Sequence, residues 1–139
     1  MSRSEAELHV QALYRTVDRK VQAAGPICTL SGFCCDFPRS GQTLFATALE
    51  TDMVLSRGEP PAPERRGWCP FYRRRLCTLR ELRPLGCRIY FCDSSFQASA
   101  MSDIAESAHR ELQRIHDEHD VPYRYAPFLD LLAERRSAP

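Results

Sequence analysis

The stretch from Cys69 to Cys92 reads CPFYRRRLCTLRELRPLGCRIYFC and contains four cysteines among prolines and a glycine. A second group of three cysteines, at positions 28, 34 and 35, precedes it. Thiolates bind zinc, iron–sulfur clusters and other soft metals, and such a site needs about four of them converging from turns. The cysteines therefore predict a metal site with the candidate ligands Cys28, Cys34, Cys35, Cys69, Cys77, Cys87 and Cys92.

The spacing of these cysteines narrows the kind of metal site. It follows C-x5-C-C and then C-x7-C-x9-C-x4-C, without the C-x2-C hook of zinc fingers and zinc ribbons. It also differs from the cysteine runs of ferredoxins. Seven thiols exceed what one zinc ion needs, so either the site is polynuclear or some thiols are spare. A spare cysteine would be a buried, inert side chain, because a free cysteine behaves as a small hydrophobe.

The order of residues around the cysteines resembles the YkgJ-type cysteine-cluster family, a zinc- or iron-chelating domain. That family shows C-x2-C-x2-C-C near its N-terminus, then a lone cysteine, then a C-x-I-Y-x-x-R-P-x-x-C-R block. In this chain Ser31 stands where the second cysteine of the first element is usual, and Leu79-Arg80 replaces Ile-Tyr in the block. The matching residues are Cys28, Cys34 and Cys35 in the first element and Cys77, Arg83, Pro84, Cys87 and Arg88 in the block.

The resemblance spans about half of the chain, from Cys28 to Cys92, and implies metal ligands within it. They are drawn from Cys28, Cys34, Cys35, Cys69, Cys77 and Cys87, with Cys92 as a substitute for the cysteine missing at Ser31. Arg83 and Arg88 are expected to offset the negative charge of the thiolates, the alternative being ordinary surface residues. Aromatic residues nearby are expected to exclude water from the metal, namely Trp68, Phe71, Tyr90 and Phe91.

The distribution of glycine and proline predicts the fold class. All six glycines and seven of the ten prolines lie between Gly25 and Gly86, so the centre is built from turns and short pieces. We expect a mainly α protein of one small domain, residues 1–139, in which helical flanks at 4–24 and 95–136 surround an irregular, cysteine-rich metal-binding centre at 28–92. Such a centre would bury little apolar surface by itself, and metal removal is expected to disorder it.

Local signals place the elements of the N-terminal half. Ser4 and Glu7 form a predicted capping box ahead of an apolar stripe that Gly25-Pro26 ends. A short strand is expected at 42–46, and a second capping box, Thr47 with Glu50, opens a helix to about Ser56. The proline-rich segment 57–67 is expected to be a surface loop.

The C-terminal half is predicted to be two helices. The first starts within 94–97 and closes at Asp120-Val121-Pro122, while the second starts with Pro127 at its first position. Phe128, Leu131 and Leu132 are expected to point inward from the second. His109, His116 and His119 are expected on the surface of the first helix rather than on a metal.

Charge and hydropathy limit the classes of partner. Lys and Arg number 19 against 18 acidic residues, so no net field favours nucleic acid. No apolar run approaches the roughly 20 residues of a membrane span, and the start of the chain does not resemble a signal peptide, so we expect a cytoplasmic protein with no membrane partner. In that compartment disulfides are rare, which favours metal binding by the thiols.

The sequence thus predicts a protein that chelates zinc or iron, the latter also as an iron–sulfur cluster, without catalysis. The residues leave open whether the chain is an enzyme. One alternative is an iron–sulfur enzyme of the flagellin lysine N-methylase type, which carries a similar cysteine cluster. A second is a thiol redox protein, although no C-x-x-C exists. The metal ion is the only partner the residues indicate.

Overall fold

A computed structural model describes residues 3–26, 43–74, 76–89, 97 and 99–136. Four of the candidate ligands, Cys28, Cys34, Cys35 and Cys92, lie outside the described residues. The elements in chain order are α1 (Arg3–Ala24), β1 (Phe45–Thr47), α3 (Ala48–Leu55), β2 (Tyr72–Arg73), β3 (Leu76–Cys77), the 3-10 helix η1 (Arg80–Leu82), α4 (Leu85–Ile89), α6 (Met101–Glu118), β4 (Tyr125–Pro127) and α7 (Phe128–Arg136). The described chain is mainly helical, as predicted.

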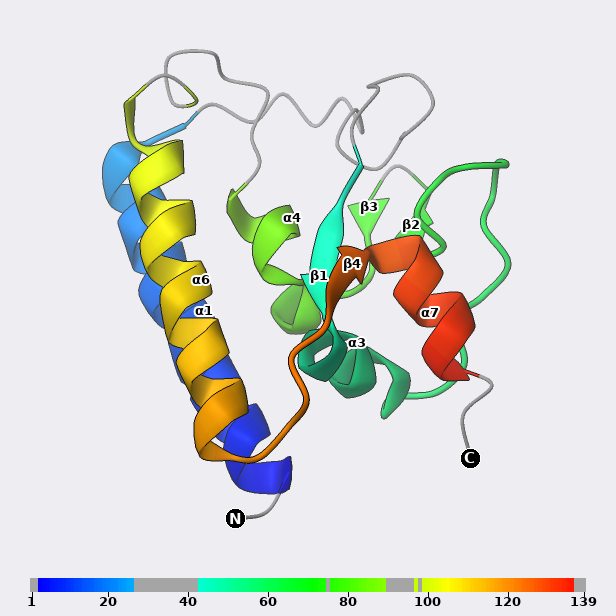
Figure 1. The fold of residues 1–139 in the computed structure, drawn as a ribbon. Helices are drawn as coiled ribbons and strands as arrows, with labels where there is room; N and C mark the ends of the chain where they lie inside the picture. The colour runs from blue at the N-terminus through cyan, green and yellow to red at the C-terminus, as the bar shows by residue number, and fades with distance from the viewer. Residues whose placement is uncertain (1–2, 27–42, 75, 90–96, 98, 137–139) are drawn as a thin grey trace.

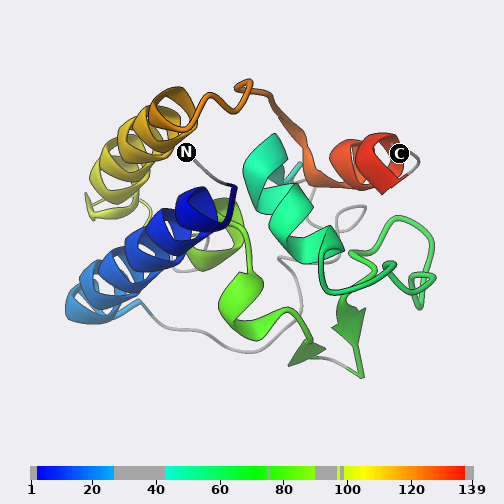
Figure 2. The same cartoon turned by 90° about the horizontal axis from the view of Figure 1, so that it is seen from below.

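The helices form two pairs on either side of a small strand ribbon (Figure 1). α1 and α6 run antiparallel and pack along their length, whereas α3 packs on α7. β1 and β4 lie between the two pairs, and α4 contacts both long helices. Seen from below, α1 and α6 remain side by side, with α3 and α7 beyond them (Figure 2). This arrangement brings the two flanks of the sequence together around its centre.

One hydrophobic core joins all of these helices. From the flanks it takes Val10, Val17, Leu112, Ile115, Phe128 and Leu131. From the centre it takes Leu49, Met53, Val54, Leu79, Leu82, Leu85 and Ile89. The described part of the centre buries its apolar residues against the flanking helices, because α3, η1 and α4 each turn an apolar side toward them.

β1 and β4 are two short strands that each lead directly into a helix. Their antiparallel register pairs Phe45 with Pro127 and Thr47 with Tyr125. β1 begins three residues later and ends one residue later than the strand predicted at 42–46, and β4 was not predicted. In a strand of only three residues, the alternation of apolar and polar side chains is too short to predict the strand from its own sequence. The pairing holds α3 and α7 next to each other, where Arg135 makes two hydrogen bonds to Asp52.

The capping box at Thr47 is confirmed. The Thr47 hydroxyl accepts a hydrogen bond from the Glu50 N–H at 3.3 Å, and Glu50 Oε1 accepts one from the Thr47 N–H at 3.1 Å. The capping box at Ser4 is wrong, because α1 already begins at Arg3 and Ser4 lies inside it. The stop at Gly25 is confirmed by its φ of 66° and by its N–H, which donates to Val21 O.

The predicted helix start within 94–97 agrees with residue 97, which is helical, as is residue 99. A turn at Ala100 separates these residues from α6, which begins at Met101, so the long helix is not continuous as predicted. The last helix begins one residue later than predicted. α7 begins at Phe128, since Pro127 is still part of β4. Phe128, Leu131 and Leu132 are buried as expected. The loop at 57–67 is mostly exposed, also as expected.

Candidate metal centre

Three of the candidate ligands lie within the described residues, on two separate elements. Cys69 is buried just before β2, and Cys77 is half-buried in β3. Tyr72 joins them, because its N–H donates to Cys69 O at 3.0 Å and it pairs with Cys77 across the hairpin. Cys87 is half-buried in α4. Among the described residues no three His, Cys, Asp or Glu side chains come together as a metal site.

The hairpin that carries Cys69 and Cys77 is packed by aromatic rings. The Trp68 and Tyr72 rings lie 5.0 Å apart, and Phe71 faces Phe128 of α7 at 6.4 Å. Trp68 and Phe71 are partly buried against the core, so the described aromatic residues cover this part of the chain from water. The other two aromatic residues expected near a metal, at positions 90 and 91, lie outside the described residues.

Arg88, next to Cys87, is buried and joins three parts of the chain. Its guanidinium donates from Nε to Arg83 O at 2.8 Å and from NH1 to Asp18 Oδ2 at 2.7 Å. A third hydrogen bond reaches Glu81 O, and the guanidinium carbon lies 4.0 Å from the centre of the Tyr14 ring. These contacts exclude the surface alternative for Arg88. They connect α4 to α1, because a planar guanidinium donates in several directions at once.

Glu50 is a second buried charged residue. The sequence predicted it only as part of a capping box and not as a buried side chain. Its Oε2 accepts hydrogen bonds from the Tyr14 hydroxyl and from the Leu85 N–H, both at 2.6 Å, and its Oε1 from Thr47. A buried carboxylate is stable only when such donors surround it. Glu50 therefore fixes the first residue of α4, two positions before Cys87.

Tyr14 lies between the two buried charges. Burial is the main cause that raises the pKa of its hydroxyl well above the usual value, and the charge of Glu50 adds to it. The charge of Arg88 opposes these effects, while a charge on Cys87 would raise the pKa of Tyr14 further. The Cys87 thiol is thus close enough to this group to interact with it electrostatically. The start of α4 is held by a continuous polar network, from Asp18 through Arg88 and Tyr14 to Glu50.

Gly86 allows α4 to approach β1 closely. A Cβ atom at this position would lie 2.8 Å from Leu44 Cδ1 and 3.1 Å from Phe45 O. The second distance involves a backbone atom, which cannot move aside as a side chain can. Glycine is therefore required here by packing, and the residue before Cys87 is held against the strand.

The histidines of α6 are more buried than expected. His116 and His119 are 0% and 6% exposed, so their predicted surface positions are wrong. They follow Leu112 and Ile115 by four residues each and thus continue the apolar side of the helix that packs on α1. This four-residue spacing from two buried apolar residues was the feature of the sequence that could have predicted the burial of both histidines. His116 Nδ1 lies 2.8 Å from Leu112 O.

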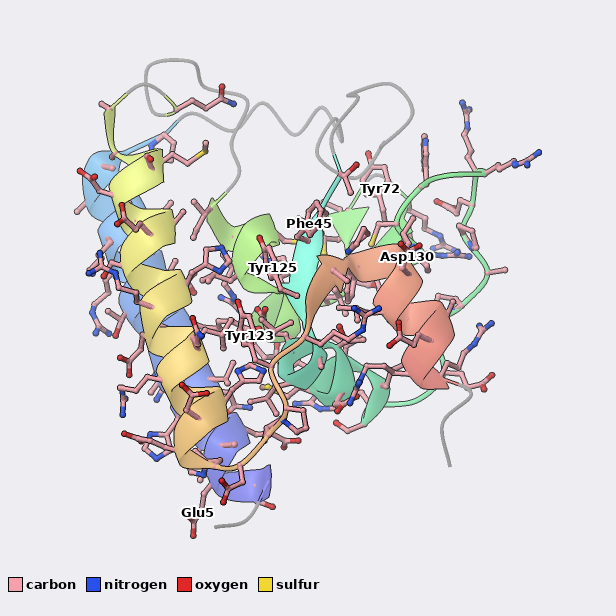
Figure 3. The ribbon with its side chains drawn as sticks, in the orientation of Figure 1. Glu5, Phe45, Tyr72, Tyr123, Tyr125 and Asp130 are labelled. Carbon is pink, nitrogen blue, oxygen red and sulfur yellow. The ribbon has the colours of Figure 1, made fainter. Side chains whose placement is uncertain are left out.

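An aromatic surface lies between α6 and the strand ribbon. Phe45 and Tyr125 stack at 5.2 Å, and the His109 ring meets Tyr125 edge-on at the same distance. Tyr123 contacts His116 in the same way at 5.1 Å. Figure 3 shows Phe45 beside Tyr125, with Tyr123 on the segment that leads into β4. The Phe45, Tyr123 and Tyr125 rings are about two-fifths exposed, and their contacts with the two histidines hold α6 against the ribbon.

His109 should make stability depend on pH. Burial is the main cause that lowers its pKa below the usual value, and the charge of Glu50 opposes it. The unfolded chain therefore binds this proton more readily, so the free energy of unfolding should fall as pH drops below about 6.5. We expect His109→Gln to lose less stability than the wild type between pH 7.5 and 5.5 in urea unfolding. Equal losses in the two proteins would contradict this role of His109.

Comparison of the chain with protein-family models, with curated proteins and with solved structures gave no match. Within the part of the chain that the structure describes, no helix combines the length and the apolar character needed to cross a bilayer. The resemblance to the YkgJ-type family thus rests on the cysteine, arginine and proline pattern quoted above.

Proposed function

We propose that this protein binds zinc or an iron–sulfur cluster through thiolates of its cysteine-rich centre and that it does not catalyse a reaction. The observation that carries the proposal is the cysteine pattern from Cys28 to Cys92. Soft thiolates in such numbers suit zinc and iron, and a reducing compartment would leave them available. The described fold supplies rigid neighbours for Cys87, since Glu50 and Arg88 hold α4 at both of its ends.

The positions of Pro26 and Ile89, where two described segments end, support one metal site shared by Cys28, Cys87 and Cys92. Pro26 lines a groove of about 410 Å³ together with Arg83 and Arg88, so the end of α1 lies beside the start of α4. Cys28 is two positions after Pro26, a reach of at most about 7 Å, and Cys92 is three positions after Ile89, a reach of at most about 11 Å. The chain is therefore short enough to bring both cysteines to the neighbourhood of Cys87.

The polar network around α4 would support a metal in a second way. Metal ligands are oriented by hydrogen bonds and charges behind them. Arg88 places a buried positive charge next to Cys87 in sequence, which would stabilise a nearby thiolate. The Asp18 and carbonyl contacts of Arg88 keep this charge in place. We expect it to act through space rather than by a direct contact with sulfur.

The test is metal analysis of protein purified without oxygen, combined with its visible absorption. Stoichiometric zinc in a colourless protein or a brown protein with inorganic sulfide would each support the proposal. Metal-free protein after anaerobic purification would contradict it and favour thiol redox chemistry. Methyl transfer to a lysine by the iron–sulfur form would contradict the absence of catalysis.

Cys87→Ser is expected to abolish the retention of this metal. Serine keeps the size of the side chain but replaces the thiolate by a hydroxyl, which is a poor ligand for soft metals. Metal content per chain is the measurement, and His109→Gln is the control that should keep the wild-type value. The unfolding of Cys87→Ser should match that of chelator-treated wild type, which separates metal loss from misfolding. Wild-type metal content in the serine variant would contradict the assignment of Cys87.

A further inference from the structure

His119, directly after α6, carries two ring nitrogens that lack a hydrogen-bond partner within the described residues. The side chain is 6% exposed, and both nitrogens are closed to solvent. A buried polar atom without a partner is destabilising, and native structures rarely retain one. A water molecule or an ion commonly supplies the missing contact in such a case.

The neighbour of His119 is another histidine, His9 of α1. Their ring centres lie 5.2 Å apart, with the planes tilted by 46°. A tetrahedral zinc ion with Zn–N bonds of about 2.0–2.1 Å would hold the centres of two imidazole rings about 5 Å apart. His9 is exposed, so a metal and its water ligands can approach from its side.

We propose that His9 and His119 bind a zinc ion between α1 and α6, with water completing its coordination. Imidazole is the commonest nitrogen ligand of zinc in proteins. One His119 nitrogen binds the metal, and its other N–H donates to an ordered water, as is usual behind a metal ligand. Both buried nitrogens are then satisfied.

The His9 side of the pair is open and lies near a negative charge. His9 lines a groove of about 350 Å³ between α1 and α6 together with Lys20 and Glu111, whereas His119 does not line it. A hydrogen bond from Arg114 is the main cause that lowers the pKa of Glu111, and the charge of His9 adds to it. A carboxylate thus lies within electrostatic reach of His9.

This site is separate from the cysteine centre. His9 and His119 lie where α1 starts and α6 ends, whereas the cysteine segments join the described chain at the other ends of these helices (Figure 1). The two metals would therefore bind independently. The zinc between the helices would clamp α1 to α6, which stabilises the folded state by mass action.

Zinc titration of the full chain tests the proposal through stoichiometry and thermal unfolding. Wild type should bind one zinc more than His9→Gln, a variant that can fold because His9 is exposed. At a free zinc concentration of about 100 times Kd, the melting temperature of the wild type should rise on the order of 8 °C more than that of the variant. His9→Asp should keep part of this rise, since a carboxylate also binds zinc. His109→Gln is the matched control and should respond as the wild type does.

Two further measurements locate the ion. The ring ¹⁵N signals of His119 should shift on addition of zinc chloride at pH 7.5. Cys87→Ser should keep the His9-dependent zinc even when it loses the cysteine-bound metal, which distinguishes the two sites. Equal zinc stoichiometry and an equal rise in melting temperature for wild type and His9→Gln would overturn the proposal. Unchanged His119 signals would leave an ordered water alone as the partner of the ring and would overturn it as well.

Discussion

Replacing Glu50 with Ala is expected to lower the free energy of unfolding by about 4 kcal/mol or more. The substitution leaves the Tyr14 hydroxyl and the backbone N–H groups of Leu85 and Thr47 buried without their acceptor. Each such donor costs about 1–3 kcal/mol, and the cavity left by the side chain adds to the loss. Urea unfolding followed by circular dichroism measures the difference.

Glu50→Gln tests the hydrogen bonds of Glu50 more specifically, because it keeps the size of the side chain and leaves no cavity. A glutamine offers one acceptor oxygen and one NH2 donor to a site where all the neighbours donate. We expect a loss of about 2–4 kcal/mol. Glu106→Gln is the matched control on α6, where an exposed carboxylate pairs with Arg110, and it should change stability by less than about 0.5 kcal/mol. Equal stability of the two glutamine variants would contradict the role of Glu50.

Replacing Arg88 with Met is expected to lower the free energy of unfolding by about 3–5 kcal/mol. The variant keeps apolar bulk over the Tyr14 ring but removes the donors to Asp18, Arg83 O and Glu81 O. Arg88→Lys should recover only part of the loss, since an ammonium cannot reach three acceptors in one plane. The free energy of unfolding in urea, measured in chelator to exclude metal effects, is again the quantity to compare.

Asp18→Asn and Arg110→Met are the controls for Arg88. The Asp18 side chain is 49% exposed, so solvent replaces part of what Arg88 provides, and we expect a loss of only about 1 kcal/mol. Arg110 is an exposed arginine of a surface ion pair, whose removal should have little effect. A larger loss in Asp18→Asn than in Arg88→Met would show that the ion pair, rather than the buried hydrogen bonds to carbonyl groups, fixes α4.

These two predictions are coupled through Tyr14. Its hydroxyl donates to Glu50, and its ring lies under the guanidinium of Arg88. Substitutions of residues that share a partner are not additive. The double variant Glu50→Gln with Arg88→Met should therefore lose less stability than the sum of the two single losses, because each of them already weakens the attachment of α4.

The sequence could predict candidate metal ligands only by their residue type and not by their position in space. Thiolate chemistry and the cysteine pattern are properties of the chain, and so are the proline and glycine positions. Which thiols meet depends on contacts between segments far apart in sequence. Of the seven candidates, Cys69 lies just before β2, Cys77 lies on β3, Cys87 lies on α4, and the other four lie outside the described residues.

The sequence by itself determined the local features: the first helix, predicted at 4–24 and found as Arg3–Ala24, its stop at Gly25, the Thr47 capping box, and the inward side of the last helix. Each depends on residues within about four positions of one another, so the pattern alone predicts it. Only the tertiary structure decided the pairing of β1 with β4, the burial of Glu50 and Arg88, and the meeting of His9 with His119. The strand pairing, the Tyr14 and Leu85 contacts of Glu50, the Asp18 contact of Arg88 and the histidine contact join residues 35 to 110 positions apart. Their stability comes from burial in a shared core, which no short window of sequence contains.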